Sequence, residues 1–269
     1  MLKFCSLFSG STGNSLYVEN GNTKILVDSG VSCKKIVDAL DSINVHPEEI
    51  DAILVTHEHS DHIQSVGTLS KKYNIPVYAN NKTWSKIPYE INKENVFEFK
   101  TSEDFSIGDL KIHSFKTPHD AAQSCGFNIF DGETKISIAT DLGHVTDEIR
   151  TCLKGSKFIL LEANYEPEVL RMCSYPFPLK TRIASPTGHL SNNSAGETIA
   201  SLINSGLSRV MLGHLSKESN FPQMAYATVV DELEKRNFKK GDIDLSIASR
   251  IHPSELLEIS WFLYLWTIL

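Results

Sequence analysis

One short segment constrains this chain more than any other: residues 56–62 read Thr-His-Glu-His-Ser-Asp-His and follow four consecutive apolar residues. The apolar run predicts a buried strand, so the segment leaves the carboxyl end of that strand. Residues two apart in an extended segment point to the same side, which lets His57 and His59 converge on one metal ion. Asp61 and His62 point elsewhere and suit a second ion. A polar surface loop is the alternative, and it explains four ligand-type side chains at this spacing less well.

Histidine and acidic residues also follow other apolar segments of the chain. Loops beyond the carboxyl ends of strands form the sites of open α/β sheets, so we expect these residues to share one rim. Apart from the segment just described, the residues that follow predicted strands in this way are Asp28, His119, Asp141, Glu162 and His214.

These positions supply enough ligands for two ions. The expected ligands of the first ion are His57, His59 and His119, and those of the second ion are Asp61, His62 and His214. Asp141 has two carboxylate oxygens and can bridge both ions. A set of His and Asp without thiolate suits Zn²⁺ or Mn²⁺. Two such ions about 3.5–4 Å apart share and activate a water, which predicts a hydrolase with two divalent cofactor ions and Asp61 among its catalytic residues.

Composition limits the function and the location. The net charge of −7 excludes a general nucleic-acid coating protein, because backbone binding depends on Lys and Arg, although a local basic patch would still admit a phosphodiester. The five cysteines are scattered and lack Cys-x-x-Cys spacing, which favours reduced thiols in the cytoplasm. No signal peptide is visible, and we expect no membrane span, since crossing a bilayer takes about 20 apolar residues.

Apolar segments and turn signals alternate along the chain in a way that predicts an α/β fold, with sheets covered by helices. We expect one domain over residues 1–258. The apolar segment 259–269 holds two of the three tryptophans and no charged residue, and we set it apart as a tail. It could be a packing segment, an interface, or sequence foreign to the domain.

The expected elements follow from periodicity and turn residues. Helices are expected near 31–42, 63–74, 80–86, 165–173, 193–205 and 222–236. Strands are expected near 2–8, 15–19, 23–28, 52–55, 75–79, 95–99, 104–107, 110–116, 124–131, 134–140, 158–162, 210–212 and 243–248. Prolines at 176 and 178 predict a break, with a loop over 180–186.

A Ser/Gly-rich turn at residues 9–15 separates the first two predicted strands. Gly10 and Gly13 permit a tight backbone with exposed N–H groups, which can line an anion site. We therefore count Ser11 and Asn14 among the candidate phosphate contacts. A plain hairpin turn is the alternative.

The pattern Thr-His-x-His-x-Asp-His at 56–62, with Asp28 before it and His119, Asp141 and His214 after it, resembles the metallo-β-lactamase superfamily. The resemblance implies a four-layer αβ/βα sandwich, two mixed sheets flanked by helices, with a dinuclear site at one edge. It also implies that Asp28 supports the site without binding metal, whereas a capping carboxylate in a turn is the alternative for this residue.

Two further segments resemble those of tRNase Z within this superfamily. Residues 161–165 are similar to its His-Glu-Ala-Thr segment, and residues 188–191 are similar to its Gly-His-Ser-Thr segment. The resemblance implies that His189 is a general acid for the leaving oxygen and that Glu162 orients it. Capping of the following helix is the alternative for His189. The chain lacks the histidine before the glutamate and any long tRNA-binding arm, so tRNA 3′ processing is not expected.

Residues 4–15, 188–192 and 212–220 resemble the YycJ/WalJ (VicX) group of bacterial proteins. The resemblance implies a cytoplasmic metal-dependent nuclease, a 5′→3′ DNA exonuclease that acts on DNA ends through metal-bound hydroxide. Lys180 and Arg182 precede His189 and are candidate phosphate contacts, with solvated surface residues as the alternative. A small-molecule phosphodiester or thioester hydrolase, or a non-catalytic metal-dependent regulator, remains open, as does the oligomeric state.

Overall fold

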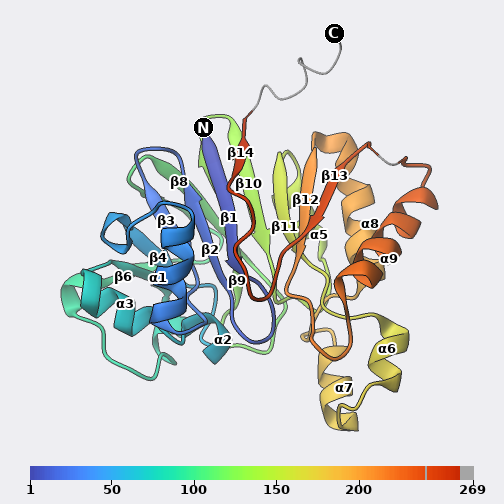
Figure 1. Ribbon diagram of the computed structural model, residues 1–269, viewed down its shortest axis with the longest axis horizontal. Coiled ribbons are helices and arrows are strands. Elements are labelled where there is room, and N and C mark those ends of the chain that lie inside the picture. The colour runs from blue at the N-terminus through green and yellow to red at the C-terminus, as the bar shows by residue number, and fades with distance from the viewer. Residues whose placement is uncertain (240, 261–269) are drawn as a thin grey trace.

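Two sheets of seven strands face each other in the computed structural model, which describes residues 1–239 and 241–260 (Figure 1). The first sheet runs, in spatial order, β14 (Leu257–Ile259), β1 (Leu2–Phe8), β2 (Ser15–Glu19), β3 (Lys24–Val27), β4 (Ala52–Leu54), β5 (Val77–Asn80) and β6 (Val96–Phe99). The second runs β13 (Asp244–Ile247), β12 (Arg209–Gly213), β11 (Phe158–Glu162), β10 (Thr134–Ala139), β9 (Cys125–Asp131), β8 (Leu110–Lys116) and β7 (Asp104–Ile107). The predicted α/β fold with two mixed sheets is confirmed.

Each sheet is antiparallel at one end and parallel at the other. Strands β3 to β6 run parallel in the first sheet, and β10 to β13 run parallel in the second. The candidate ligands follow these parallel strands and β8, which runs in the same direction as β10 because both pair antiparallel with β9. Their carboxyl ends meet at one edge of the sandwich, because parallel strands end on the same side.

Helices cover the outer face of each sheet and complete the four layers (Figure 1). The helices on the first sheet are α1 (Cys33–Ser42), α2 (Ser60–Ile63), α3 (Val66–Tyr73) and α4 (Asn81–Trp84). Those that follow the strands of the second are α5 (Asp147–Leu153), α6 (Pro167–Met172), α7 (Phe177–Ile183), α8 (Asn192–Leu202) and α9 (Pro222–Glu234). Three short 3₁₀ turns lie at Pro47–Glu49, Lys93–Asn95 and Ile203–Ser205. None of the helices in the described part of the chain combines the length and the apolar character needed to cross a bilayer.

The alternation of side chains along each strand builds the layers. In β1, Phe4 faces the core between the sheets, whereas Cys5 faces the core beneath α1 and α3. In β4, Leu54 and Ile53 divide in the same way. Successive side chains point to opposite faces, so a strand buried on both faces needs an uninterrupted apolar run. That is the pattern that precedes the histidine-rich segment.

Helices α2, α5 and α7 and strand β14 differ from the sequence-based expectations, and α2 places Ser60–Ile63 in a helix where a loop was expected. Helix α5 falls where we expected no element, and α7 spans Phe177–Ile183, where prolines predicted a break. Proline is tolerated in the first turn of a helix because the N–H it lacks would have no partner there, so Pro176 and Pro178 begin the helix instead of ending it.

Strand β14 crosses the boundary that we drew before the tail. Ile259 pairs with Leu2 in the antiparallel β14–β1 ladder and is buried. Residues 261–269 lie outside the described residues, and the division of the chain into domain and tail stays a prediction.

Replacing Phe158 by Ala tests the core between the sheets. The Phe158 ring lies 4.5 Å from the Phe4 ring of the opposite sheet, measured between centroids, and both are fully buried. We expect Phe158→Ala to lower the free energy of unfolding by about 3–5 kcal/mol in urea titrations. The matched control Phe177→Ala removes a ring that is 81% exposed and should change it by less than about 0.5 kcal/mol. Equal losses in the two variants would contradict this packing.

Candidate metal centre

Seven candidate ligands gather at the edge where the parallel strands end. The loop after β4 carries His57 and His59, and α2 carries Asp61 and His62. The other three come from the second sheet: His119 follows β8, Asp141 follows β10 and His214 follows β12. The site therefore lies between the two halves of the sandwich, and neither sheet holds a complete ligand set.

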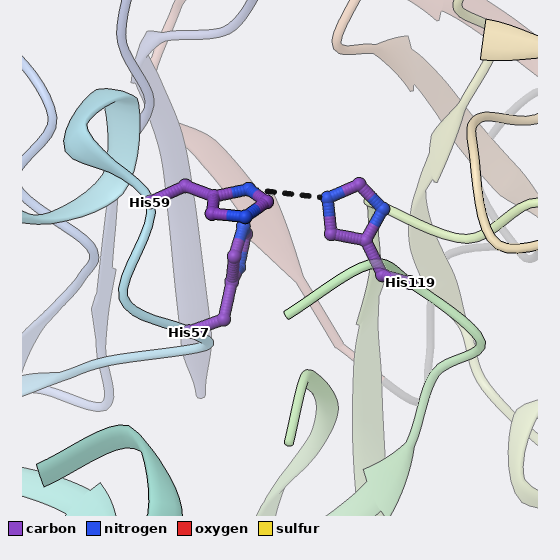
Figure 2. A group of neighbouring side chains, drawn as sticks. All are labelled: His57, His59 and His119. Atoms are coloured by element: carbon purple, nitrogen blue, oxygen red, sulfur yellow. Dashed lines mark hydrogen bonds between the residues drawn. The ribbon is translucent and has the colours of Figure 1, made fainter. Parts of the chain in front are cut away.

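His57, His59 and His119 form the first cluster, and their rings point toward one another (Figure 2). The ring centroids lie 4.6–5.1 Å apart, and His119 Nε2 is 3.3 Å from His59 Nδ1. His119 donates from Nδ1 to the carbonyl of Gly188 at 3.0 Å, which leaves Nε2 as a lone-pair donor facing the cluster. Burial lowers the pKa of His57 and of His119, which favours the neutral rings that metal binding requires.

Asp61, His62 and His214 form the second cluster. Asp61 Oδ2 lies 3.6 Å from His62 Nε2 and 3.8 Å from His214 Nε2. The Nδ1 atoms of both histidines point away from the cluster, toward the carboxylates of Asp28 and Glu162 at 2.8 and 2.9 Å. Each ring is therefore held at Nδ1 and turns Nε2 toward the cluster, although Asn14 Nδ2 also lies 3.0 Å from His62 Nε2.

Asp141 lies between the two clusters. Its Oδ1 is 3.7 Å from His119 Nε2 and 3.6 Å from His214 Nε2, and its Oδ2 is 3.4 Å from His62 Nε2. One carboxylate thus reaches a histidine of the first cluster and two of the second. This geometry is what a bridging carboxylate requires.

Three buried polar atoms test whether a cation fits this arrangement. His57 Nε2, His214 Nε2 and Asp141 Oδ2 have no hydrogen-bond partner among the described residues. A buried polar atom without a partner is costly, and a divalent cation between these atoms would satisfy nitrogen lone pairs and carboxylate oxygen together. The clusters of His and Asp therefore indicate binding of a divalent metal.

The electrostatic field of the site points the same way. Burial lowers the pKa of His62, but the carboxylates of Asp141, Asp28 and Asp61 outweigh this effect and raise the pKa to about 9. The field that stabilises a proton on this ring also favours a metal cation in its place.

Asp28 orients one side of the site without facing either cluster. Its Oδ1 accepts the backbone N–H of Thr56 at 2.9 Å, and its Oδ2 accepts the Thr56 hydroxyl at 2.8 Å as well as His62 Nδ1. The Thr56 hydroxyl lies in turn 3.0 Å from His57 Nδ1. Thr56 was not among our predicted site residues, although its place directly before His57 was a signal that could have revealed it.

Glu162 plays the corresponding part on the other side. Its Oε1 accepts His189 Nδ1 at 2.7 Å and His214 Nδ1 at 2.9 Å, and its Oε2 accepts the backbone N–H of Leu142 at 3.0 Å and of Leu190 at 3.2 Å. Burial raises the pKa of this carboxyl, but the two histidines outweigh it and lower the pKa overall. The ionised form is therefore favoured, and His189 is left with Nε2 free.

The candidate phosphate contacts occupy different surroundings. Arg182 donates from Nη2 to Asp120 Oδ1 at 3.0 Å, and this same oxygen lies 3.4 Å from His119 Nε2, so Arg182 lies at the rim of the site. Lys180 donates to the carbonyl of Arg171 at 2.7 Å, on the side of α6. Asp120 was missed by sequence reasoning, although it follows a predicted ligand directly.

The two candidates of the Ser/Gly-rich turn also differ. Ser11 is exposed at its tip, whereas Asn14 is buried. The side-chain Oδ1 of Asn14 accepts the Gly10 N–H at 2.9 Å, and its Nδ2 lies 3.0 Å from His62 Nε2. The structure thus brings Asn14 against a candidate ligand and leaves Ser11 at the surface.

Comparison with known proteins gives consistent relatives along most of the chain. The family described as beta-lactamase superfamily domain matches residues 23–215. The chain is 39% identical to exodeoxyribonuclease WalJ of Streptococcus pneumoniae over 89% of its own length and 91% of that protein. It is 37% identical to exodeoxyribonuclease YycJ of Bacillus anthracis over 94% and 96%. The crystal structure of the metallo-β-lactamase fold protein YhfI of Bacillus subtilis superposes with a TM-score of 0.72 at 18% identity, over 95% of this chain and 100% of that one.

Replacing Asp28 by Asn tests the support of the metal centre. Asparagine has the size of aspartate, but one of its two terminal groups is an N–H₂, which cannot accept a hydrogen bond. The variant therefore cannot accept the hydrogen bonds of both Thr56 and His62. We expect metal affinity to fall about 10–100-fold, measured by competition with a chelating dye. The control Asp147→Asn changes an exposed carboxylate of α5 and should leave the affinity unchanged. Equal affinities in the two variants would show that Asp28 does not support the centre.

Proposed function

Since this chain belongs to the β-lactamase superfamily, we propose that it is a metal-dependent exodeoxyribonuclease that hydrolyses phosphodiester bonds at DNA ends. The observation that carries the proposal is the carboxylate oxygen shared by His189 and His214. It joins a histidine with a free ring nitrogen to a candidate metal ligand, and so sets a proton donor beside a metal centre. Two relatives named as exodeoxyribonucleases, similar over nearly their whole length, support DNA as the substrate.

We assign two ions to the centre, Zn²⁺ or Mn²⁺. His57, His59 and His119 would hold the first, Asp61, His62 and His214 would hold the second, and Asp141 would touch both. When bound, such a pair supplies an activated water for attack on phosphorus and neutralises the charge that grows on the phosphoryl oxygens. The three unpartnered buried atoms of the centre support this assignment.

His189 is the proposed general acid. Glu162 accepts the Nδ1–H, so the proton that the departing sugar oxygen receives would come from Nε2–H of the ring protonated on both nitrogens. The ring lies 5.1 Å from that of His119 and 5.2 Å from that of His214, between centroids, so a phosphate at the centre is close to it. The sugar oxygen of DNA is a poor leaving group unless it receives a proton, so hydrolysis of DNA needs a proton donor at the position of His189.

Arg182 is the proposed phosphate contact at the rim. Its guanidinium is held by Asp120 beside His119, and a planar, always charged group suits a phosphate. We propose that Lys180, Ser11 and Asn14 act with it, Asn14 through its contact with His62. The 5′→3′ polarity and a cytoplasmic location complete the proposal, the latter supported by five free cysteines.

A nuclease assay tests the activity and its dependence on the centre. We expect the metal-loaded protein to degrade end-labelled single- or double-stranded DNA, and the label position to reveal a 5′→3′ direction. His59→Ala should lower the rate by at least about 100-fold, because it removes one of three ligands from the first ion. His46→Ala, a change of an exposed histidine, is the matched control. No degradation by the wild type with either Zn²⁺ or Mn²⁺ would refute the nuclease proposal.

A second experiment isolates the role of His189. We expect His189→Ala to slow DNA cleavage about 10²–10⁴-fold while the metal content per chain is retained. The loss should be much smaller for a p-nitrophenyl phosphodiester, since p-nitrophenolate departs without receiving a proton. An equal loss on both substrates would reject the proton-donor role, and loss of metal would make His189 a ligand.

A further inference from the structure

Two adjoining cavities lie beside the tip of the Ser/Gly-rich turn. The larger has a volume of about 550 Å³ and the smaller about 310 Å³. Thr12, Arg250 and Ile251 line both, so the cavities meet at these three residues. We call the two together the turn groove.

The turn groove adjoins the metal centre through the chain itself. Leu215 lines the larger cavity and directly follows His214. Val31 lines the smaller one and follows Gly30, which packs so tightly on the carbonyl of Asp61 that a Cβ there would lie 1.6 Å from the oxygen. One wall of the larger cavity is therefore continuous with the loop that carries His214, and one wall of the smaller cavity adjoins a residue that packs on Asp61.

The turn joins these two walls. Gly10 pairs with Leu215 as an isolated β-bridge, and the N–H of Asn14 donates to the carbonyl of Asp61 at 2.8 Å. Thr12 lies between these two anchored positions and is exposed. The exposed tip thus lines the groove and is anchored on either side to a segment that carries a candidate ligand.

The groove carries positive charge in a chain whose net charge is −7. Lys35 lines the smaller cavity, Lys217 the larger, and Arg250 both, against one acidic lining residue, Asp38. Both lysines are exposed, and among the described residues no ion pair engages these three cations. Arg250 donates to the carbonyl of Ser216 at 3.1 Å, which holds the guanidinium in the groove.

We propose that the turn groove binds the sugar–phosphate backbone of the DNA strand beyond the bond held at the metal centre. The inference rests on the proposed nuclease function and adds the path of the substrate. A groove with three cations attracts phosphates irrespective of base sequence, and single-stranded DNA is bound by such positively charged grooves. An exonuclease that removes successive nucleotides needs contacts to the phosphates, because such contacts bind DNA of any base sequence equally well.

The double variant Lys35→Glu/Lys217→Glu tests the groove, with Lys86→Glu/Lys93→Glu as a control of equal charge change at exposed positions. In the metal-loaded protein, kcat/KM is measured at low salt on a 30-mer and on a dinucleotide. We expect the groove variant to lose at least about tenfold on the 30-mer and at most about threefold on the dinucleotide. The slope of log kcat/KM against log salt concentration should also fall, by about 0.7 for each lysine that contacts a phosphate. The control should match the wild type on both substrates.

Binding of a hydrolysis-resistant phosphorothioate 30-mer, followed by fluorescence anisotropy, separates this proposal from the nuclease proposal. If the wild type cleaves neither substrate, the nuclease proposal fails, and weaker binding by the groove variant alone still supports the groove. Wild-type binding and wild-type turnover of the 30-mer by the groove variant would overturn it. Equal losses on the 30-mer and the dinucleotide would also overturn it, since the lysines would then act on the centre itself.

Discussion

The site depends on one buried carboxylate. Glu162 accepts four hydrogen bonds at the end of β11, two from histidine rings and two from backbone N–H groups. Leu142 and Leu190, which supply the backbone groups, adjoin Asp141 and His189. A fully buried charge is tolerated only when hydrogen-bond donors surround it. The loops that carry Leu142, Leu190 and His214 must therefore stay in place for Glu162 to remain ionised. The same bonds hold the candidate ligands and the proposed acid.

Asp28 plays the equivalent part at the end of β3, where it holds Thr56 and His62. The sandwich thus brings two supporting carboxylates to one edge, one from each sheet, with Asp141 between the ligands that they orient. Asp28, Asp141 and His214 all have positive φ angles of 55–61°. Non-glycine residues adopt this conformation at a cost, and it gathers where surrounding contacts enforce it, as they do around a functional centre. Asp141 and His214 lie in two of the loops that bond to Glu162, and Asp28 holds Thr56 and His62 by hydrogen bonds, so each of these residues lies where hydrogen bonds fix the loop.

Positively charged residues lie on two sides of the metal centre. Arg182 of α7 lies at the rim beside Asp120 and His119, and the turn groove adjoins the centre through Leu215 and Val31. In both places the cations lie outside the ligand clusters, so the phosphate contacts that we propose for them would not compete with the metal ligands. A chain of negative net charge can in this way attract a polyanion locally.

The sequence by itself determined the metal-ligand types, their spacing and their position after apolar strands, because these are local properties of short segments. The resemblance to a known superfamily pointed to Asp28 and Glu162 as supporting carboxylates, and the uninterrupted apolar run predicted that β4 is buried. Tertiary structure decided what depends on partners distant in the chain: the pairing of β14 with β1, the contact of Asn14 with His62, and the hold of Asp120 on Arg182. It also decided which ring nitrogen of His119, His189 and His214 faces the centre, since acceptors far away in the sequence bind the other one. The prolines of α7 show the same limit, because a residue that ends one helix begins another, and only packing selects between them.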